Sequence, residues 1–279
     1  MTDLPELVDE ILLQRRQSAL FVTLNRPQAK NALNGAIVSG LTTLCDWLKE
    51  QHDVRIVVLR GAGGAFCGGG DIKEFGKMMM TLEPAAGEGD MVASRNRQFG
   101  DLLLRLDAMS QVLVTVIEGP CFGGANGFLC VSDVAIAETH ARFSLSETTL
   151  GIPPAQIGPF LVRRIGLYSA RRLALTGAHF GAREAMRIGL VDNVVDGAAG
   201  LEGALVETLS AIGRCEPQAN AATKQILNRA ASFVDPAQLD QAAQDFARCL
   251  RDKGREGARA FANKSAAPWI ENFAVKKEV

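Results

Sequence analysis

The sequence has little of what metal-binding, disulfide-rich or nucleic-acid-binding proteins usually need. Its three histidines have no H-E-x-x-H or similar spacing, and its six cysteines include no C-x-x-C pair, so neither a zinc site nor a disulfide framework is expected. The 30 Lys and Arg residues balance 31 Asp and Glu residues, and only 6% of the residues are aromatic. Nucleic-acid-binding surfaces normally carry a basic excess, so we expect no nucleic-acid partner.

Long apolar runs and a targeting segment are also missing. The first ten residues, MTDLPELVDE, are acidic and contain neither an apolar stretch nor an Arg-rich amphipathic one. No apolar run approaches the length of a membrane-spanning helix. We therefore expect a soluble, cytoplasmic protein with no membrane partner, in a compartment that keeps its cysteines reduced.

What the sequence does contain is a recurring order of strand, glycine-rich turn and helix. Short runs rich in β-branched and apolar residues predict strands at residues 20–24, 56–59, 112–117 and 134–137. Apolar residues at helical spacing predict helices over residues 37–48 and 99–106. This alternation favours an α/β architecture with mainly parallel strands. Residues 201–263 have almost no strand signal, so we expect a core domain in residues 1–200 and a helical domain in residues 201–279.

Two glycine-rich segments follow predicted strands, at residues 61–71 (GAGGAFCGGGD) and 119–124 (GPCFGG). Neither fits a phosphate-binding motif: no P-loop is present, and the dinucleotide pattern that begins at Gly61 has Phe66 in place of its third glycine. Paired glycine turns can instead form an oxyanion hole, in which two N–H groups stabilise charge on one carbonyl oxygen. Glycine content alone leaves open that both are ordinary tight turns.

A single carboxylate, Glu147, lies among small and apolar residues in FSLSETTLGIPP, residues 143–154. A carboxyl group in a poorly solvated pocket has a raised pKa and can act as a general acid or base. The same residue could also be a solvated side chain at the start of a helical turn. The isolated residue does not decide between these interpretations.

The segment A-F-C-G-G-G-D-I-K at residues 65–73 resembles the A-F-x-A-G-x-D-I/L signature of the crotonase (enoyl-CoA hydratase/isomerase) superfamily. Further matching motifs follow in the family's order, and together they cover residues 18–264: L-N-R-P at 24–27, N-A-L at 31–33, G-x-x-x-G-G at 119–124, S-D-V-A-I-A at 132–137, residues 143–154, and A-R-R-L-A-L-T-G at 170–177. The resemblance implies a crotonase-like α/β spiral of ββα units with a C-terminal helical trimerisation domain. It also implies a homotrimer or homohexamer.

The resemblance further implies an acyl-CoA thioester as substrate, with no bound cofactor and no metal. The N–H groups of Gly68 and Gly124 would polarise the thioester carbonyl, and Glu147 would transfer protons. The residues expected to contact the CoA part are Ala65, Gly69, Gly70, Asp71, Phe261 and Lys264. Those expected near the acyl group are Phe75, Gly127, Pro154 and Gln156.

One position departs from the family pattern. Typical hydratases of the family carry two glutamates, and Gly127 stands where the first is expected. This leaves either an isomerase that uses Glu147 alone or a hydratase with one carboxylate. The run P-A-Q-I-G-P-F-L-V-R-R-I-G at residues 154–166 resembles the methylglutaconyl-CoA and isohexenylglutaconyl-CoA hydratases, which favours hydration of a branched 2-enoyl-CoA. Hydrolase, decarboxylase or dehydration chemistry and a non-catalytic acyl-CoA- or RNA-binding scaffold remain alternatives.

Overall fold

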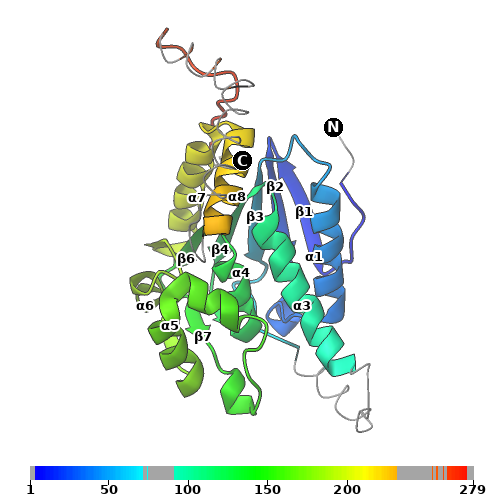
Figure 1. Ribbon diagram of the computed structural model, residues 1–279. Coiled ribbons are helices and arrows are strands. Elements are labelled where there is room, and N and C mark those ends of the chain that lie inside the picture. The colour runs from blue at the N-terminus through cyan, green and yellow to red at the C-terminus, as the bar shows by residue number, and fades with distance from the viewer. Residues whose placement is uncertain are drawn as a thin grey trace.

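A six-stranded sheet forms the centre of the protein (Figure 1). The computed structural model describes residues 4–71, 74, 91–230, 253, 256, 260 and 263–274. The strand order is β1-β2-β3-β4-β6-β9; β1 and β2 are antiparallel and all other neighbours are parallel. The strands are β1 (Ile11–Arg16), β2 (Ala19–Leu24), β3 (Ile56–Gly61), β4 (Val112–Ile117), β6 (Val134–Glu138) and β9 (Asn193–Val195).

A second, three-stranded sheet has the order β5-β7-β8. It comprises β5 (Pro120–Phe122), β7 (Arg142–Ser144) and β8 (His179–Gly181). β5 and β7 are parallel, whereas β7 and β8 are antiparallel. Because β5 follows β4 directly, this small sheet begins where the central parallel strands end.

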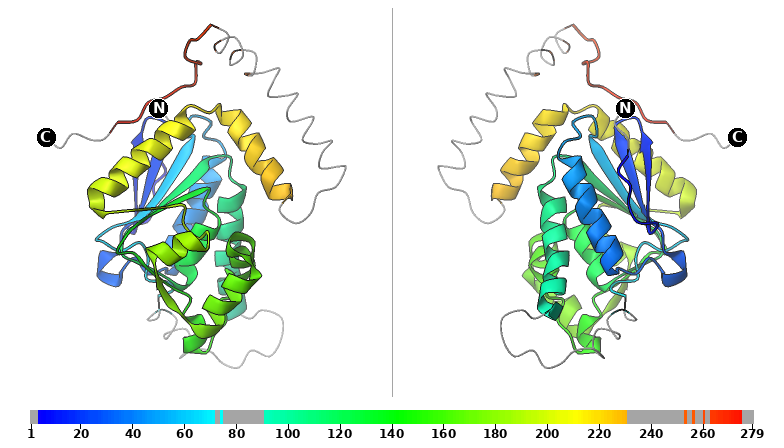
Figure 2. Two further views of the ribbon diagram at one scale, coloured as in Figure 1. Left: turned by 90° about the vertical axis from the view of Figure 1, so that its left-hand side faces the viewer. Right: turned by 90° about the vertical axis from the view of Figure 1, so that its right-hand side faces the viewer.

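Helices cover both faces of the central sheet (Figure 2). Along β3, Val57 and Leu59 belong to the core shared with α1, α3, α4 and α5, whereas Ile56 and Val58 pack with α7 on the other face. This explains the continuous apolar run, because both faces of the strand are buried. The described helices are α1 (Gly35–Leu48), α3 (Met91–Ala108), α4 (Asn126–Cys130), α5 (Gly158–Thr176), α6 (Ala182–Arg187), α7 (Gly197–Gly213) and α8 (Pro217–Ala230), with the 3-10 turns η1 (Pro27–Ala29), η2 (Gly123–Ala125) and η3 (Glu147–Leu150).

The ends of α1 and α5 follow from local sequence signals. The Asn34 side chain accepts a hydrogen bond from the Ile37 N–H at 2.9 Å, which caps the start of α1. Gly177, with φ +60°, ends α5 in the left-handed conformation that suits glycine. None of the described helices combines the length and hydropathy that crossing a bilayer requires.

The expected α/β class and the strands predicted at residues 20–24, 56–59, 112–117 and 134–137 are confirmed, within one or two residues at each end. Residue 200, the expected domain boundary, lies inside α7. Leu201, Leu205 and Leu209 of this helix pack on the central sheet. The division into two domains stays a prediction, but α7 contributes to the core of the sheet.

Candidate active site

The two glycine-rich loops lie side by side, because Cys67 and Cys121 form a parallel bridge between them. The Cys67 N–H donates to the Pro120 carbonyl oxygen at 2.9 Å, and the Phe122 N–H donates to the Cys67 carbonyl oxygen at 3.0 Å. The first loop follows β3, and the second follows β4 and contains β5. Parallel strands place their carboxyl ends at one edge of a sheet. Two segments that lie far apart in the chain thus form one structural unit.

The structure corrects the oxyanion donor expected in the first loop. The Gly68 N–H donates to the Lys30 carbonyl oxygen at 2.7 Å, so this N–H is not free to bind a substrate oxygen. Gly70 instead forms a parallel bridge with Leu33, and the peptide groups on either side of Gly70 bond to Leu33 at 2.7 and 2.9 Å. In such a bridge the N–H of the central residue points away from the partner strand. The expectation for Gly68 is therefore wrong. The N–H of Gly70 points away from Leu33, so Gly70 is the better candidate for the donor in this loop.

Leu33 also brings Gly70 close to Gly124. Its backbone pairs with Gly70, and its Cδ1 atom lies 3.7 Å from the position that a Cβ would occupy on Gly124. Gly124 belongs to the first turn of η2, where N–H groups have no acceptor within the helix. No heavy atom lies within 4 Å of a Cβ built on Gly70. Leu33 thus lies beside both glycines.

Glu147 begins η3, directly beside the second loop. A Cβ built on Gly123 would lie 3.3 Å from Glu147 Oε1, and φ at Gly123 is +53°. Burial raises the pKa of Glu147, and a hydrogen bond from its own backbone opposes the shift. Its Oε2 atom is buried without a hydrogen-bond partner among the described residues. A carboxyl group in this state readily exchanges a proton with a neighbouring molecule.

A second carboxylate at Gly127 would have to displace core side chains. A Cβ at this position would lie 2.8 Å from Cγ2 of Ile157 and 2.9 Å from Cδ1 of Leu103. Both of these side chains belong to the core, with 2% and 0% of their surface exposed. The expected contact between Gly127 and the substrate is therefore replaced by packing against core side chains. The space of the missing glutamate is filled with apolar groups.

Three other residues expected at the site, Ala65, Asp71 and Gln156, bond to neighbouring parts of the protein. The Ala65 carbonyl accepts a hydrogen bond from Asn31 at 2.7 Å, and Asp71 forms an ion pair with Arg26 at 2.9 Å, so both help to hold the first loop. Gln156 donates to Asn96 Oδ1 at 2.9 Å and thereby links its loop to α3. Pro154 is half-buried two residues earlier.

Of the expected residues Lys264, Phe75 and Phe261, the structure describes only Lys264. Lys264 is exposed, with φ +52°, and its expected position near another subunit stays a prediction. Phe75 and Phe261 lie outside the described residues. Phe99 of α3 does lie beside the second loop, with its ring edge 3.5 Å from the Cβ position of Gly124.

The two cysteines that pair the loops are in surroundings that disfavour the thiolate form. Burial raises the pKa of the Cys67 thiol to about 12 and also raises the pKa of Cys121 well above its ordinary value. Both thiols stay protonated at neutral pH, and thiolate is the reactive form. Within the described ranges, no group of three or more His, Cys, Asp or Glu side chains could hold a metal ion.

Two buried asparagines support the loops, and the sequence reasoning missed both. Asn31 donates to the carbonyl oxygens of Ala62 at 2.9 Å and Ala65 at 2.7 Å in the first loop. Asn126 donates to the carbonyl oxygens of Gly123 at 3.0 Å and Ser144 at 2.9 Å beside the second. Each is completely buried. For Asn126 the available signal was a single polar amide within the small and apolar stretch of residues 123–130.

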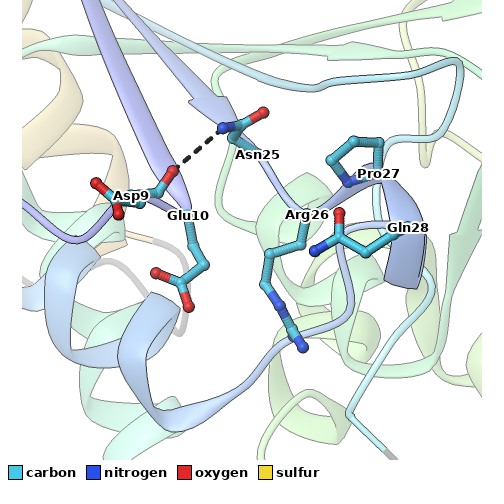
Figure 3. Close-up of a pocket in the computed structure, with 6 residues that line it drawn as sticks. All are labelled: Asp9, Glu10, Asn25, Arg26, Pro27 and Gln28. Carbon is cyan, nitrogen blue, oxygen red and sulfur yellow. Dashed lines mark hydrogen bonds between the residues drawn. The ribbon is translucent and has the colours of Figure 1, made fainter.

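A polar pocket of about 460 Å³ lies between the residues that precede β1 and those that follow β2, and Glu147 does not line it (Figure 3). It is lined by Asp9, Glu10, Asn25, Arg26, Pro27 and Gln28. Arg26 connects it to the first loop, because its guanidinium also donates to Asp71 at 2.9 Å and to the Ala32 carbonyl at 2.7 Å. The pocket therefore adjoins the CoA-binding segment implied by the sequence.

Comparisons with known proteins identify the family of the chain. The enoyl-CoA hydratase/isomerase family model matches residues 14–272. The structure is similar to that of Pseudomonas aeruginosa AtuE, with a TM-score of 0.90 and 45% identity over 94% of this chain and 100% of that one. The 2,3-dehydroadipyl-CoA hydratase of Escherichia coli (strain K12) is 32% identical over 259 residues, 92% of this chain and 97% of that protein. The mevalonyl-coenzyme A hydratase SIDH of Beauveria bassiana is 29% identical over 259 residues, 91% of each chain.

The family match covers nearly the whole chain, and the solved structures confirm the crotonase-like fold that the motifs implied. Members of this family act on CoA thioesters, which fits two glycine loops and a carboxyl group gathered at one edge of the sheet. The protein is an enzyme of the enoyl-CoA hydratase/isomerase family.

Proposed function

We propose that the protein hydrates a branched 2-enoyl-CoA thioester of the glutaconyl type. The observation that carries this proposal is the buried Glu147 carboxyl group against Gly123, next to the N–H of Gly124. This arrangement joins a proton-transfer group to a site for a developing oxyanion. The names of two relatives support the acyl group: a mevalonyl chain is branched at C3, and a dehydroadipyl chain ends in a second carboxyl group. A 3-methylglutaconyl group has both features.

In the proposed mechanism one carboxyl group serves both proton transfers. Ionised Glu147 takes a proton from water as the water oxygen bonds to C3. The electrons of the double bond move toward the thioester oxygen, which accepts hydrogen bonds from the N–H groups of Gly70 and Gly124. The protonated Glu147 then returns the proton to C2, so that one water molecule is added and the carboxylate is regenerated.

The CoA part of the substrate would lie along the first loop. We propose that Ala65, Gly69, Gly70 and Asp71 line this part of the site, with the Arg26–Asp71 ion pair holding the loop in place. Phe261 and Lys264 would contact the nucleotide end from a neighbouring subunit of a homotrimer or homohexamer. A cytoplasmic location also remains a prediction.

Isomerisation is the second candidate, and Gly127 is the observation that favours it. With no carboxylate at this position, Glu147 could move a proton from C4 to C2 without adding water. A one-carboxylate isomerase and a one-carboxylate hydratase would share the same oxyanion donors. The substrates, not the site residues, distinguish them.

The test is a spectrophotometric assay of the purified enzyme with crotonyl-, 3-methylglutaconyl-, isohexenylglutaconyl- and 3-enoyl-CoA. Hydration removes the ultraviolet absorbance of the conjugated enoyl thioester, whereas isomerisation of a 3-enoyl-CoA creates it. We expect the fastest loss of absorbance with a branched glutaconyl substrate. A rise with 3-enoyl-CoA and no hydration of the other three would establish the isomerase instead.

A further inference from the structure

Asn126 connects the second glycine loop to the strand that leads to Glu147. Its Nδ2 group donates to the Gly123 carbonyl oxygen at 3.0 Å and to the Ser144 carbonyl oxygen at 2.9 Å. Gly123 belongs to the turn that carries the Gly124 N–H, and Ser144 ends β7, three residues before Glu147. A single side-chain amide therefore bridges the two parts of the site.

The bridge is completely buried. Asn126 has 0% of its surface exposed and belongs to the hydrogen-bonded start of α4. Its Nδ2 also lies 3.4 Å from the Cys121 carbonyl oxygen, and the Cys121 thiol approaches its Oδ1 at 3.9 Å. Water does not compete for these bonds, so they hold a fixed geometry more strictly than bonds on the surface.

The geometry matters because the Glu147 carboxyl group lies close to the turn. Glu147 Oε1 lies 3.3 Å from the Cβ position of Gly123, the same residue whose carbonyl Asn126 holds. Positions of reacting groups that change by about 1 Å can lower a rate about 10²-fold. A bond that sets the distance between the Gly124 N–H and Glu147 therefore acts on turnover.

We propose that Asn126 is a positioning residue: its amide fixes the spacing between the oxyanion donor Gly124 and the proton-transfer group Glu147. The proposal rests on the roles given to these two residues in the proposed function. Asn126 touches neither the thioester nor the proton, and acts only through the turn and β7. Asn126 directly precedes Gly127, the position at which two-glutamate hydratases carry their other carboxylate.

Asn126→Ser is the most specific variant. A serine hydroxyl in a helix commonly donates to a carbonyl three or four residues earlier, so the introduced hydroxyl can keep the bond to Gly123. The shorter side chain cannot also reach Ser144, and the connection to β7 is lost. Asn126→Ala removes both bonds. Cys130→Ala is the matched control, because Cys130 is buried in the same short helix and makes none of these bonds.

The readout is exchange of the α-proton of butyryl-CoA in D₂O, followed by NMR, together with kcat and KM for hydration. Exchange needs only a polarised thioester and a base, so it reports on positioning even if the acyl group proposed above is wrong. We expect Asn126→Ser and Asn126→Ala to lower exchange and kcat by about 10- to 100-fold, with the Kd for butyryl-CoA within about threefold of wild type.

The control separates positioning from stability. Cys130→Ala should lower Tm to a similar extent and leave exchange near the wild-type rate. If both Asn126 variants exchange the α-proton as fast as Cys130→Ala, the proposal is overturned. If Asn126→Ala does not fold, Asn126→Ser alone decides between these outcomes. Wild-type exchange without hydration of any branched substrate would overturn the proposed function and leave the role of Asn126 standing.

Discussion

Gly69 approaches Phe122 so closely that a Cβ on the glycine would lie 2.9 Å from the phenylalanine carbonyl oxygen. Gly69 also has φ +94°, a conformation that residues with a side chain rarely adopt. The two loops can therefore come together only because this residue has no side chain. In the chain, Gly69 lies between Cys67, which pairs with Cys121, and Gly70, which carries the candidate N–H donor.

Gly69→Ala should separate the loops. We expect a loss of stability of more than about 1–2 kcal/mol, the usual cost of a left-handed conformation alone, and a fall in kcat of about 10²-fold. Gly64→Ala is the control, because Gly64 has φ +71° in the same loop and open space around its Cβ position. Thermal unfolding and initial rates measure both effects. Equal behaviour of the two variants would show that the contact with Phe122 does not matter.

Gly127→Glu should not restore a two-glutamate hydratase. The new side chain would meet Ile157 and Leu103, and its carboxyl group would be buried among apolar atoms. We expect a markedly lower Tm and no gain in turnover of crotonyl-CoA. Gly203→Glu provides a matched control, because Gly203 is an exposed helical glycine with open space around its Cβ position. Faster hydration of crotonyl-CoA at unchanged Tm would contradict the packing described here.

The sequence predicted the long elements better than the details of the site. The runs at 56–59 and 112–117 were recognisable because buried parallel strands are continuously apolar. The strands β5, β7, β8 and β9 have three residues each, which is too short for any periodicity to appear. The pairing of β5 with β7 nevertheless joins the second loop to the strand that ends three residues before Glu147.

The sequence motif could not decide whether Gly68 or Gly70 provides the oxyanion N–H. The motif marks the loop, but the direction of each N–H depends on pairing with Lys30 and Leu33, residues more than thirty positions away in the chain.

Asn126 was missed for a related reason. Its function depends on where the carbonyl oxygens of Gly123 and Ser144 lie, and only the folded chain places them.

Two glutamates should affect stability with opposite dependence on pH. Burial raises the pKa of Glu147, so its ionisation costs stability as the pH rises above about 4.5. Hydrogen bonds from Arg187 and Arg172 lower the pKa of Glu184 to about 2, so its ionised form contributes stability that is lost as the pH falls below about 4.5.

Thermal unfolding of two variants between pH 3 and pH 7 tests this pair. Glu147→Gln should be more stable than wild type at pH 7, and the difference should vanish toward acid pH. Glu184→Gln should be less stable than wild type at pH 7, with a difference that also shrinks toward acid pH. A Glu147→Gln variant less stable than wild type at pH 7 would mean that Glu147 is not in a desolvated environment.

Assembly into trimers or hexamers should involve the outer side of α5 and η3. Leu150, Leu167, Tyr168 and Leu175 expose between 58% and 82% of their surface there, and exposed apolar groups that cluster often mark subunit contacts. Sedimentation velocity should show a trimer or larger species, and Tyr168→Glu should shift it toward smaller ones. A stable wild-type monomer at micromolar concentration would exclude the assembly.

Glu147→Gln tests the central claim most directly. Glutamine keeps the size and polarity of the side chain but cannot carry the proton, so hydration of the best branched enoyl-CoA should slow by at least about 10²-fold. The Kd for a saturated acyl-CoA should stay near the wild-type value, and Glu184→Gln should hydrate at the wild-type rate. The decisive measurement is therefore the kcat of Glu147→Gln, taken together with its Kd for a saturated acyl-CoA. A large loss of kcat with normal binding is the predicted result, and wild-type kcat would contradict the mechanism.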